Sequence, residues 1–270
     1  HFSYRAQWQA AAAHGQAARR ASLPPWMAPA AGPLPAPAEA GSELSLDALR
    51  GFLLDPAAQF LRQRLHLRLP GLEELGEDLE PLQAPGRGLE RMQLQQAVFE
   101  ALLRGDGQAV MQASLRARGL LPSGPPGRLA LAGVLEEVAP YAEAYAAWRG
   151  DAVATTLPLE VEVDGVRLHG HIGEVLPQGI ARLRFGTPNG RSTVRNGLDW
   201  LLACAAGLPH PFEEFHQDED RGVGPHRREW LSPQAAIEGL RTLLALREQG
   251  LCAPLPLAPY SSWALFEKRE

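Results

Sequence analysis

Apolar residues recur every three or four positions through much of the first half of the chain, the spacing that places them on one face of an α-helix. This spacing predicts helices at residues 45–54, 89–104, 109–118 and 128–148, and another that begins at Pro56. Ser45 is a suitable N-cap for the first helix, and Pro56 is tolerated in a first helical turn. Pro140 should kink or divide the longest helix, because proline cannot donate an interior helical hydrogen bond. The helix at 89–104 is expected to be amphipathic, with Leu89, Met92, Gln96 and Phe99 spaced along one face.

A different pattern begins at residue 157. Apolar residues alternate with charged ones over residues 157–163, which predicts a half-buried strand. Asp164-Gly165 then supplies the residue types of a two-residue hairpin turn, so residues 166–176 are expected to form the return strand. A further turn leads to a third strand at residues 180–185, and the three strands together predict a meander.

Helical spacing returns after the meander. It predicts a helix at residues 193–206 and another at residues 232–249, which Gly250 should cap. The segment between them, residues 208–230, is polar and rich in acids, and we expect a mobile acidic loop there. The order of helices, strand meander and helices predicts an α+β (mixed α/β) fold.

The amino-terminal residues differ in composition from the rest. Residues 21–41 hold many of the 24 prolines in an Ala/Pro-rich run, which is typical of a linker or an extended arm. Trp26 in this run is a candidate anchor for the arm. The expected organisation is an arm and linker at residues 1–44 and a domain at residues 45–270, with a helical part at 45–150 and a sheet core with helices at 151–270.

The composition narrows the class of protein only slightly. With 270 residues and 45% hydrophobic content the chain can bury a core, and its net charge of −5 does not indicate nucleic-acid binding. We expect no membrane span, because no apolar run approaches the ~18 residues that one requires. Cys204 and Cys252 are expected to be buried free thiols of a reducing compartment. The expected location is therefore cytoplasmic, and a start at His1 without a signal peptide suggests a piece cut from a longer chain.

Two neighbouring strands of the meander hold the most informative residues. Gly173 lies on the first, and Arg182-Leu183-Arg184 lies on the second. The pair resembles strands of the PD-(D/E)xK nuclease superfamily, in which the first supplies an Asp and the second an Asp/Glu-x-Lys. Those acids hold a divalent cation through oxygen ligands, and the cation activates water. An arginine in place of an acid repels the cation, so we expect no catalytic residue and no metal-binding residue here.

Two alternative metal sites are conceivable. The first is an active metal-dependent nuclease that uses Glu174 as a displaced acid, although strand alternation points Glu174 to the face opposite Gly173. The second is a zinc site at His169 and His171, whose spacing puts both rings on one strand face. The neighbouring loop has no tight ligand spacing, so a solvated surface is the simpler interpretation of the two histidines.

A local basic run consists of Arg182, Arg184, Arg191 and Arg195. The first two share a strand face, and the other two share a helix face at i, i+4 spacing. Guanidinium groups pair well with phosphate and with carboxylate, so these residues are candidates for binding DNA or a partner protein. A plain solvated face is the third possibility. The chain has no GxxxxGK[ST] loop and no GxGxxG turn that opens a helix, and we expect no cofactor.

Several segments occur in an order and at a spacing that are informative together. They are residues 55–65, 88–93 and 115–124, then Gly165-Val166 with Gly170, then residues 200–207 and 252–255. This series, which spans most of residues 45–260, resembles the C-terminal domain of the RecC family, the gamma subunit of bacterial exodeoxyribonuclease V.

The resemblance implies a subunit of a RecBCD-like helicase–nuclease that processes double-strand breaks. It implies a nuclease-like fold that has lost its active site and serves as a scaffold. The partners that it implies are RecB-like and RecD-like subunits in a heterotrimer, together with double-stranded DNA ends that the domain guides or splits. The domain itself is then expected to be catalytically inert.

Overall fold

The computed structural model describes residues 32–37, 42–67, 83–86 and 88–268. The chain divides into two compact units, His1–Pro35 and Ala36–Glu270, and the elements below belong to the second. Trp26 and most of the Ala/Pro-rich run lie outside the described residues.

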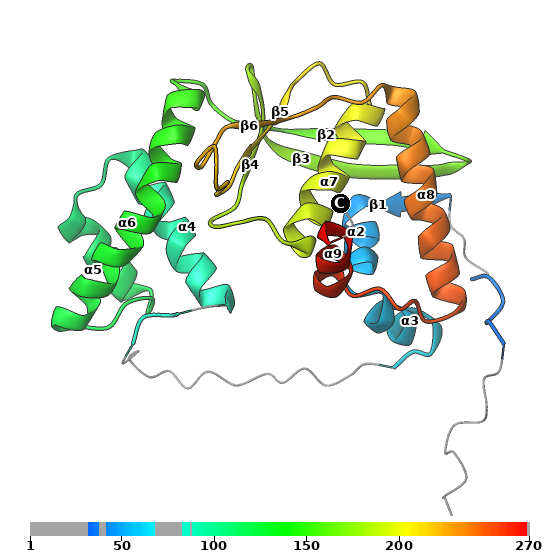
Figure 1. Cartoon of the computed structure of the whole chain (residues 1–270), viewed down its shortest axis with the longest axis horizontal. Helices are drawn as coiled ribbons and strands as arrows, with labels where there is room; N and C mark the ends of the chain where they lie inside the picture. The colour runs from blue at the N-terminus through cyan, green and yellow to red at the C-terminus, as the bar shows by residue number, and fades with distance from the viewer. Residues whose placement is uncertain (1–31, 38–41, 68–82, 87, 269–270) are drawn as a thin grey trace, which may run out of the picture. The chain divides into compact units, whose positions relative to one another are not determined.

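Within the described part of the chain, six strands form one mixed sheet (Figure 1). They are β1 (Glu43–Ser45), β2 (Thr155–Val163), β3 (Val166–Leu176), β4 (Gly179–Leu183), β5 (Phe212–Phe215) and β6 (His226–Arg228). β3 pairs with antiparallel β2 on one side, and with parallel β1 and antiparallel β4 on the other. β5 continues the sheet parallel to β4, and β6 is antiparallel to β5.

Helices precede, interrupt and follow the strands, so the predicted α+β class is confirmed. They are α2 (Leu46–Leu54), α3 (Pro56–Arg64), α4 (Gly88–Arg104), α5 (Gln108–Ala117), α6 (Gly124–Arg149), α7 (Gly190–Ala205), α8 (Pro233–Cys252) and α9 (Pro259–Glu267). Side-chain caps begin several of them. Ser45 accepts a hydrogen bond from the backbone of Ala48, and Asn189 and Ser192 form a reciprocal capping box at the start of α7. No described helix is long and apolar enough to cross a membrane.

The predicted meander is confirmed as β2, β3 and β4. Asp164 and Gly165 have φ angles of 50° and 81°, as a two-residue hairpin turn with left-handed residues requires, and Val163 pairs with Val166 across it. The second hairpin is tight as well, because Leu176 pairs with Gly179.

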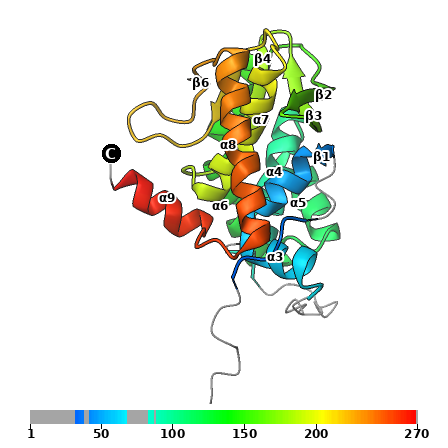
Figure 2. The same ribbon diagram turned by 90° about the vertical axis from the view of Figure 1, so that its right-hand side faces the viewer.

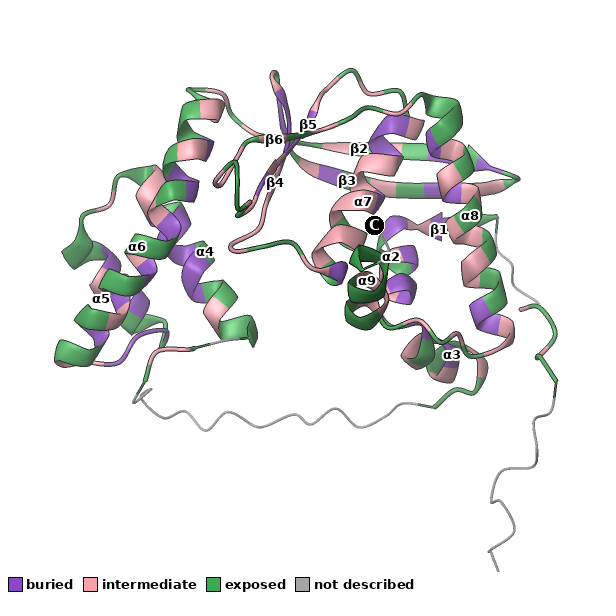
Figure 3. Ribbon diagram, viewed as in Figure 1, coloured by how far each residue is buried: buried purple, intermediate pink, exposed green. Residues whose placement is uncertain are grey.

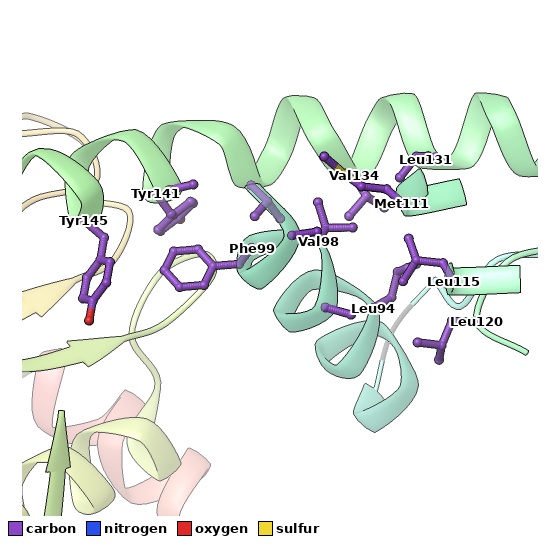
Figure 4. Close-up of a cluster of buried hydrophobic side chains, with 14 of the residues drawn as sticks. Leu94, Val98, Phe99, Met111, Leu115, Leu120, Leu131, Val134, Tyr141 and Tyr145 are labelled. Atoms are coloured by element: carbon purple, nitrogen blue, oxygen red, sulfur yellow. The ribbon is translucent and has the colours of Figure 1, made fainter. Parts of the chain in front are cut away.

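The hydrophobic core consists of two clusters. The first joins α4, α5 and α6 to Leu176, Ala181 and Phe215 of the sheet, and Figure 4 shows side chains of the three helices gathered between them. Edge-to-face rings extend this cluster, with Tyr145 of α6 5.5 Å from Phe215. The second cluster packs α2, α7 and α8 against strand residues that include Ile172 and Phe212. Figure 2 shows α8 alongside α7, which it contacts.

Pro140 does not divide its helix. α6 runs without a break from Gly124 to Arg149, so the predicted division is wrong. Val138 and Tyr141, on either side of Pro140, are buried in the first core cluster, and this packing offsets the missing hydrogen bond. Pro140 itself is exposed, where water can reach the carbonyl that lost its donor.

Gly250 does not cap its helix either, because α8 continues to Cys252. A Cβ atom on Gly250 would lie 2.4 Å from Cζ of the buried Phe52. The position therefore requires glycine for a close approach between α8 and α2, and the capping prediction is wrong.

The buried face of α4 also differs from the prediction. Leu89 is 65% exposed and Met92 is 43% exposed, whereas Phe99 is buried as expected. The buried stripe instead consists of Leu94, Ala97, Val98 and Ala101. Figure 3 shows the first turns of α4 mostly exposed. The apolar residues Leu89 and Met92 at the start of α4 thus stay outside the core, and those from Leu94 onward pack into it.

The expected mobile acidic loop at residues 208–230 is in part a sheet edge, and that prediction is wrong for β5 and β6. Phe212 and Phe215 are fully buried, which anchors β5. The Glu213 side chain is only 3% exposed, and Nη2 of Arg227 on β6 lies 2.6 Å from its carboxylate. Glu214 accepts a hydrogen bond from Arg228 in the same way. Ion pairing across the hairpin therefore allows acidic residues to occupy strands.

Candidate functional site

A cavity of about 540 Å³ lies where β3, β4 and α7 meet. It includes Gly173 and Arg182, the two positions at which the sequence predicted lost metal-binding acids. Its lining residues are Arg50, His171, Gly173, Glu174, Arg182, Arg195, Asn196 and Asp199.

Each nitrogen of the Arg182 guanidinium group contacts an oxygen atom. Its Nε donates to Oδ2 of Asp199 at 2.9 Å, and its Nη2 lies 2.8 Å from the same oxygen. Its Nη1 donates to the carbonyl oxygens of Gly173 at 2.9 Å and Ala181 at 2.7 Å. The guanidinium also lies over the ring of Phe212, 5.5 Å from its centroid. Arg182 thus fixes β3 to β4 and both strands to α7.

Asp199 on α7 binds a second guanidinium. Nη2 of Arg50, from α2, donates to its Oδ1 at 2.6 Å. The side chains are only 13% exposed for Asp199, 14% for Arg182 and 22% for Arg50. We call these three residues the Arg–Asp network. Such a poorly solvated carboxylate between two guanidinium groups leaves little free acceptor capacity for a metal ion.

Glu174 lies at a β-bulge. Between β2 and β3, residues 173 and 174 together face the single residue 156, and Glu174 has a φ of 54°. The bulge interrupts the strand alternation at Gly173 and Glu174, and both residues line the cavity. The Glu174 carboxylate accepts a hydrogen bond from the Tyr145 hydroxyl at 2.7 Å. Burial, and then this hydrogen bond, raise the pKa of Tyr145 well above its ordinary value.

The other three arginines of the basic run line a second cleft, of about 610 Å³, between α4 and α7. Arg184 follows the end of β4, and Arg191 and Arg195 lie on the first turns of α7. Arg195 borders both the cleft and the cavity of the Arg–Asp network. The structure therefore places Arg182 in a buried ion pair and gathers Arg184, Arg191 and Arg195 at an accessible surface.

The histidine pair is not part of a ligand cluster. His169 and His171 are exposed on β3, and the described residues contain no group of three His, Cys, Asp or Glu side chains that could hold a metal ion. Cys204 and Cys252 are free thiols, as expected, with Cys204 buried and Cys252 only partly so.

Sequence reasoning missed Asp199, Arg50 and Tyr145. One signal was present, since Asp199 is the one acidic residue between Gly190 and Ala205. A single carboxylate on a half-buried helix needs a cationic partner. Nothing in the sequence near Arg50 or Tyr145 marks either as part of this site.

The fold and site define an α+β domain in which Arg182 and Asp199 tie the neighbouring strands β3 and β4 to α7. The chain belongs to the family of RecC C-terminal domains, whose family model matches residues 41–270. It is similar to the RecBCD enzyme subunit RecC of Escherichia coli (strain K12), with 25% identity over 230 residues, 85% of this chain and 20% of that protein. It is also similar to the RecBCD enzyme subunit RecC of Mycolicibacterium smegmatis, with 26% identity over 264 residues, 94% of this chain and 23% of that protein. The chain thus spans about a fifth of the length of these relatives.

Proposed function

We propose that this chain is a non-catalytic structural and DNA-guiding domain of a RecC-like subunit in a RecBCD helicase–nuclease, exodeoxyribonuclease V. The complex would act in double-strand break repair by recombination. Its partners would be RecB-like and RecD-like subunits in a heterotrimer, and its substrate double-stranded DNA ends. The family match over residues 41–270 and the two relatives, each named as a RecC subunit of a RecBCD enzyme, support this proposal.

A nuclease-like core fits the arrangement of β3 and β4. In the PD-(D/E)xK superfamily the metal-binding acids come from two adjacent strands. Here β3 and β4 are antiparallel neighbours, and a side chain of β4 reaches the backbone of β3 at the expected place, Arg182 to Gly173. The two compared positions are therefore next to each other in space, which supports the assignment.

The Arg–Asp network is the main observation in favour of a domain without nuclease activity. A divalent cation at this place needs carboxylate oxygens with free lone pairs. The Asp199 carboxylate already accepts hydrogen bonds from Arg182 and Arg50, and a cation would lie beside the charge of Arg182. Repulsion and the lost ion pairs both disfavour metal binding. The domain accordingly has no catalytic residue, no metal site and no cofactor.

An active metal-dependent nuclease is the alternative, and one observation favours it. The bulge brings Glu174 to the same cavity as Asp199, so two carboxylates line one space. Against this, each carboxylate already has a partner, Tyr145 for Glu174 and two arginines for Asp199. A metal would have to displace all of these donors before it gained two ligands.

DNA hydrolysis by the purified chain distinguishes the two functions. We expect no cleavage of linear or forked DNA with magnesium or manganese, because Arg182 would repel either ion and Asp199 is already bound by two arginines. Glu174→Ala is the control for trace contamination, since a contaminant cleaves equally in both preparations. Metal-dependent cleavage that disappears in Glu174→Ala would establish the alternative.

We propose the whole basic run, Arg182, Arg184, Arg191 and Arg195, as DNA- or partner-binding. The buried ion pair of Arg182 gives it a supporting part in this role, because it holds the strand from which Arg184 extends. The accessible part of the surface is the cleft that contains Arg184, Arg191 and Arg195.

A further inference from the structure

One wall of the cleft between α4 and α7 carries exposed apolar side chains among polar ones. Leu89 and Met92 lie at positions i and i+3 of α4, and both line the cleft. Leu89 is 65% exposed and Met92 is 43% exposed, whereas the buried stripe of the same helix packs into the core. Tyr260 of α9, 56% exposed, adds an aromatic side chain at the rim. Exposed apolar side chains that lie together outside the core are typical of a docking surface.

The opposite wall is basic and without neutralising acids. Among the described residues, Arg184, Arg191 and Arg195 form no ion pair, and Arg184 donates only a 3.4 Å hydrogen bond to the carbonyl of Thr187. Arginines nearby are different, since Arg91 of the same cleft pairs with Glu137 and Arg182 pairs with Asp199. Three free guanidinium groups gathered in a chain of net charge −5 are an unusual local excess of positive charge.

We propose that this cleft docks an acidic, amphipathic segment of a partner protein. The apolar residues of the segment would cover Leu89, Met92 and Tyr260, and its carboxylates would pair with the three arginines. The inference rests on the proposed function, because it places the segment in one of the partner subunits. It deepens that function by assigning this surface to protein assembly.

The mixed walls favour a protein segment over nucleic acid. A phosphate backbone would satisfy the arginines, but it would leave Leu89 and Met92 against a polyanion that cannot cover them. Nucleic-acid grooves combine positive charge with aromatic stacking platforms. Of the two aromatic residues that line this cleft, Phe185 packs against the rings of Phe99 and Tyr141, and Tyr260 is exposed. An acidic amphipathic protein segment, in contrast, can cover the exposed apolar side chains and pair with the arginines at the same time. A cleft of about 610 Å³ is also of a size that encloses side chains of a peptide.

Photo-crosslinking in the assembled complex tests the inference. A benzoyl-phenylalanine replaces Met92 in the full-length subunit that carries this chain, and the subunit is assembled with its RecB-like and RecD-like partners on a DNA end. After irradiation, we expect one crosslink, to a segment of a partner chain that is rich in Asp or Glu and has apolar residues at helical spacing. The same photo-reactive residue at Leu129, which is 78% exposed on α6 and outside the cleft, is the matched control and should not yield this crosslink.

Charge reversal of the arginines is the second part of the experiment. Arg191→Glu combined with Arg195→Glu should lower the yield of the crosslink from position 92 at least about tenfold, because like charges would face each other across the contact. Arg116→Glu on α5, an exposed arginine outside the cleft, should leave the yield unchanged. A crosslink to DNA, or none to any other chain in an assembled complex, would overturn the inference alone. Failure of the wild-type subunit to assemble would instead overturn the proposed function on which the inference rests.

Discussion

Asp199→Asn is the substitution that tests the Arg–Asp network most sharply. The asparagine side chain has almost the same shape as the aspartate and keeps one carbonyl oxygen. The other oxygen becomes an amide NH2 group, which faces either Arg182 or Arg50, and both offer only N–H donors at that place. The variant therefore leaves two poorly solvated guanidinium groups without a counter-charge, and changes no packing volume.

The expected loss of stability follows from the burial of the three side chains. Removing one partner of a buried ion pair costs about 3–5 kcal/mol. Here the side chains keep 13–22% exposure, so some water reaches the orphaned charges, and the low end applies, about 3 kcal/mol. With a urea m-value of roughly 3 kcal/mol per molar for a chain of this size, the unfolding midpoint should fall by about 1 M.

Urea unfolding followed by tryptophan fluorescence measures this change, since Trp200 is next to Asp199 on α7. Arg182→Gln should cost less, because Arg50 still holds the carboxylate, and the double variant should lose less than the sum of the two. Asp47→Asn is the matched control, since Asp47 pairs with the same Arg50 but is 85% exposed, and its midpoint should stay near that of the wild type. An Asp199→Asn midpoint as close to the wild type as that of Asp47→Asn would refute the reasoning.

Three further predictions concern other parts of the domain. Gly250→Ala should destabilise the folded chain by about 1–3 kcal/mol in a thermal melt, because its Cβ would displace the buried ring of Phe52. Gly133→Ala, with open space around it, should be neutral or stabilising in the same assay. The raised pKa of Tyr145 means that the native chain keeps a proton that the unfolded chain loses above about pH 10, so stability should fall as the pH rises beyond that value. Tyr145→Phe should weaken this alkaline loss, and an unchanged slope would contradict the assignment. Burial raises the pKa of the Cys204 thiol, so a thiol reagent should label Cys252 in the native chain and reach Cys204 only on unfolding; equal labelling rates would contradict this burial.

Elements with strong local signals were predictable from the sequence. The hairpin at Asp164-Gly165 is an example, because the turn residues and the alternation of β2 agree without any distant contact. The start of α2 also follows from a side chain within a few residues. α7, in contrast, begins at Gly190, three residues before the predicted start, because Asn189 and Ser192 cap it there. Errors arose where packing decides between local alternatives, as for the apolar residues of α4 and for the glycine at position 250.

The short strands β1, β5 and β6 were missed for a physical reason. Each has only three or four residues, too few for a periodic pattern, and each depends on a partner strand distant in sequence. Because Glu213 and Glu214 are acidic, the segment that forms β5 was interpreted as part of a loop. Their arginine partners on β6, 14 residues later, make burial of the carboxylates possible, and the sequence pattern does not reveal that pairing.

The candidate site was only half predictable. Arg182 was found because a strand pair resembled one that holds metal-binding acids. Its partner Asp199 is 17 residues away on a helix, and Arg50 is a further 149 positions from Asp199. The bulge at Glu174 also has no local signature, since a left-handed residue is usually glycine and here it is glutamate.

The central claim is that this domain contributes no chemistry to the proposed RecBCD-like complex. Its most direct test is the rate of metal-dependent DNA hydrolysis per assembled complex, with the full-length subunit reconstituted with its RecB-like and RecD-like partners and carrying either wild-type Glu174 or Glu174→Gln. The account predicts equal rates, because a catalytic centre in another subunit would do the cleavage and Glu174 only accepts a hydrogen bond from Tyr145. Loss of cleavage in the Glu174→Gln complex, with the amount of assembled complex unchanged, would contradict it.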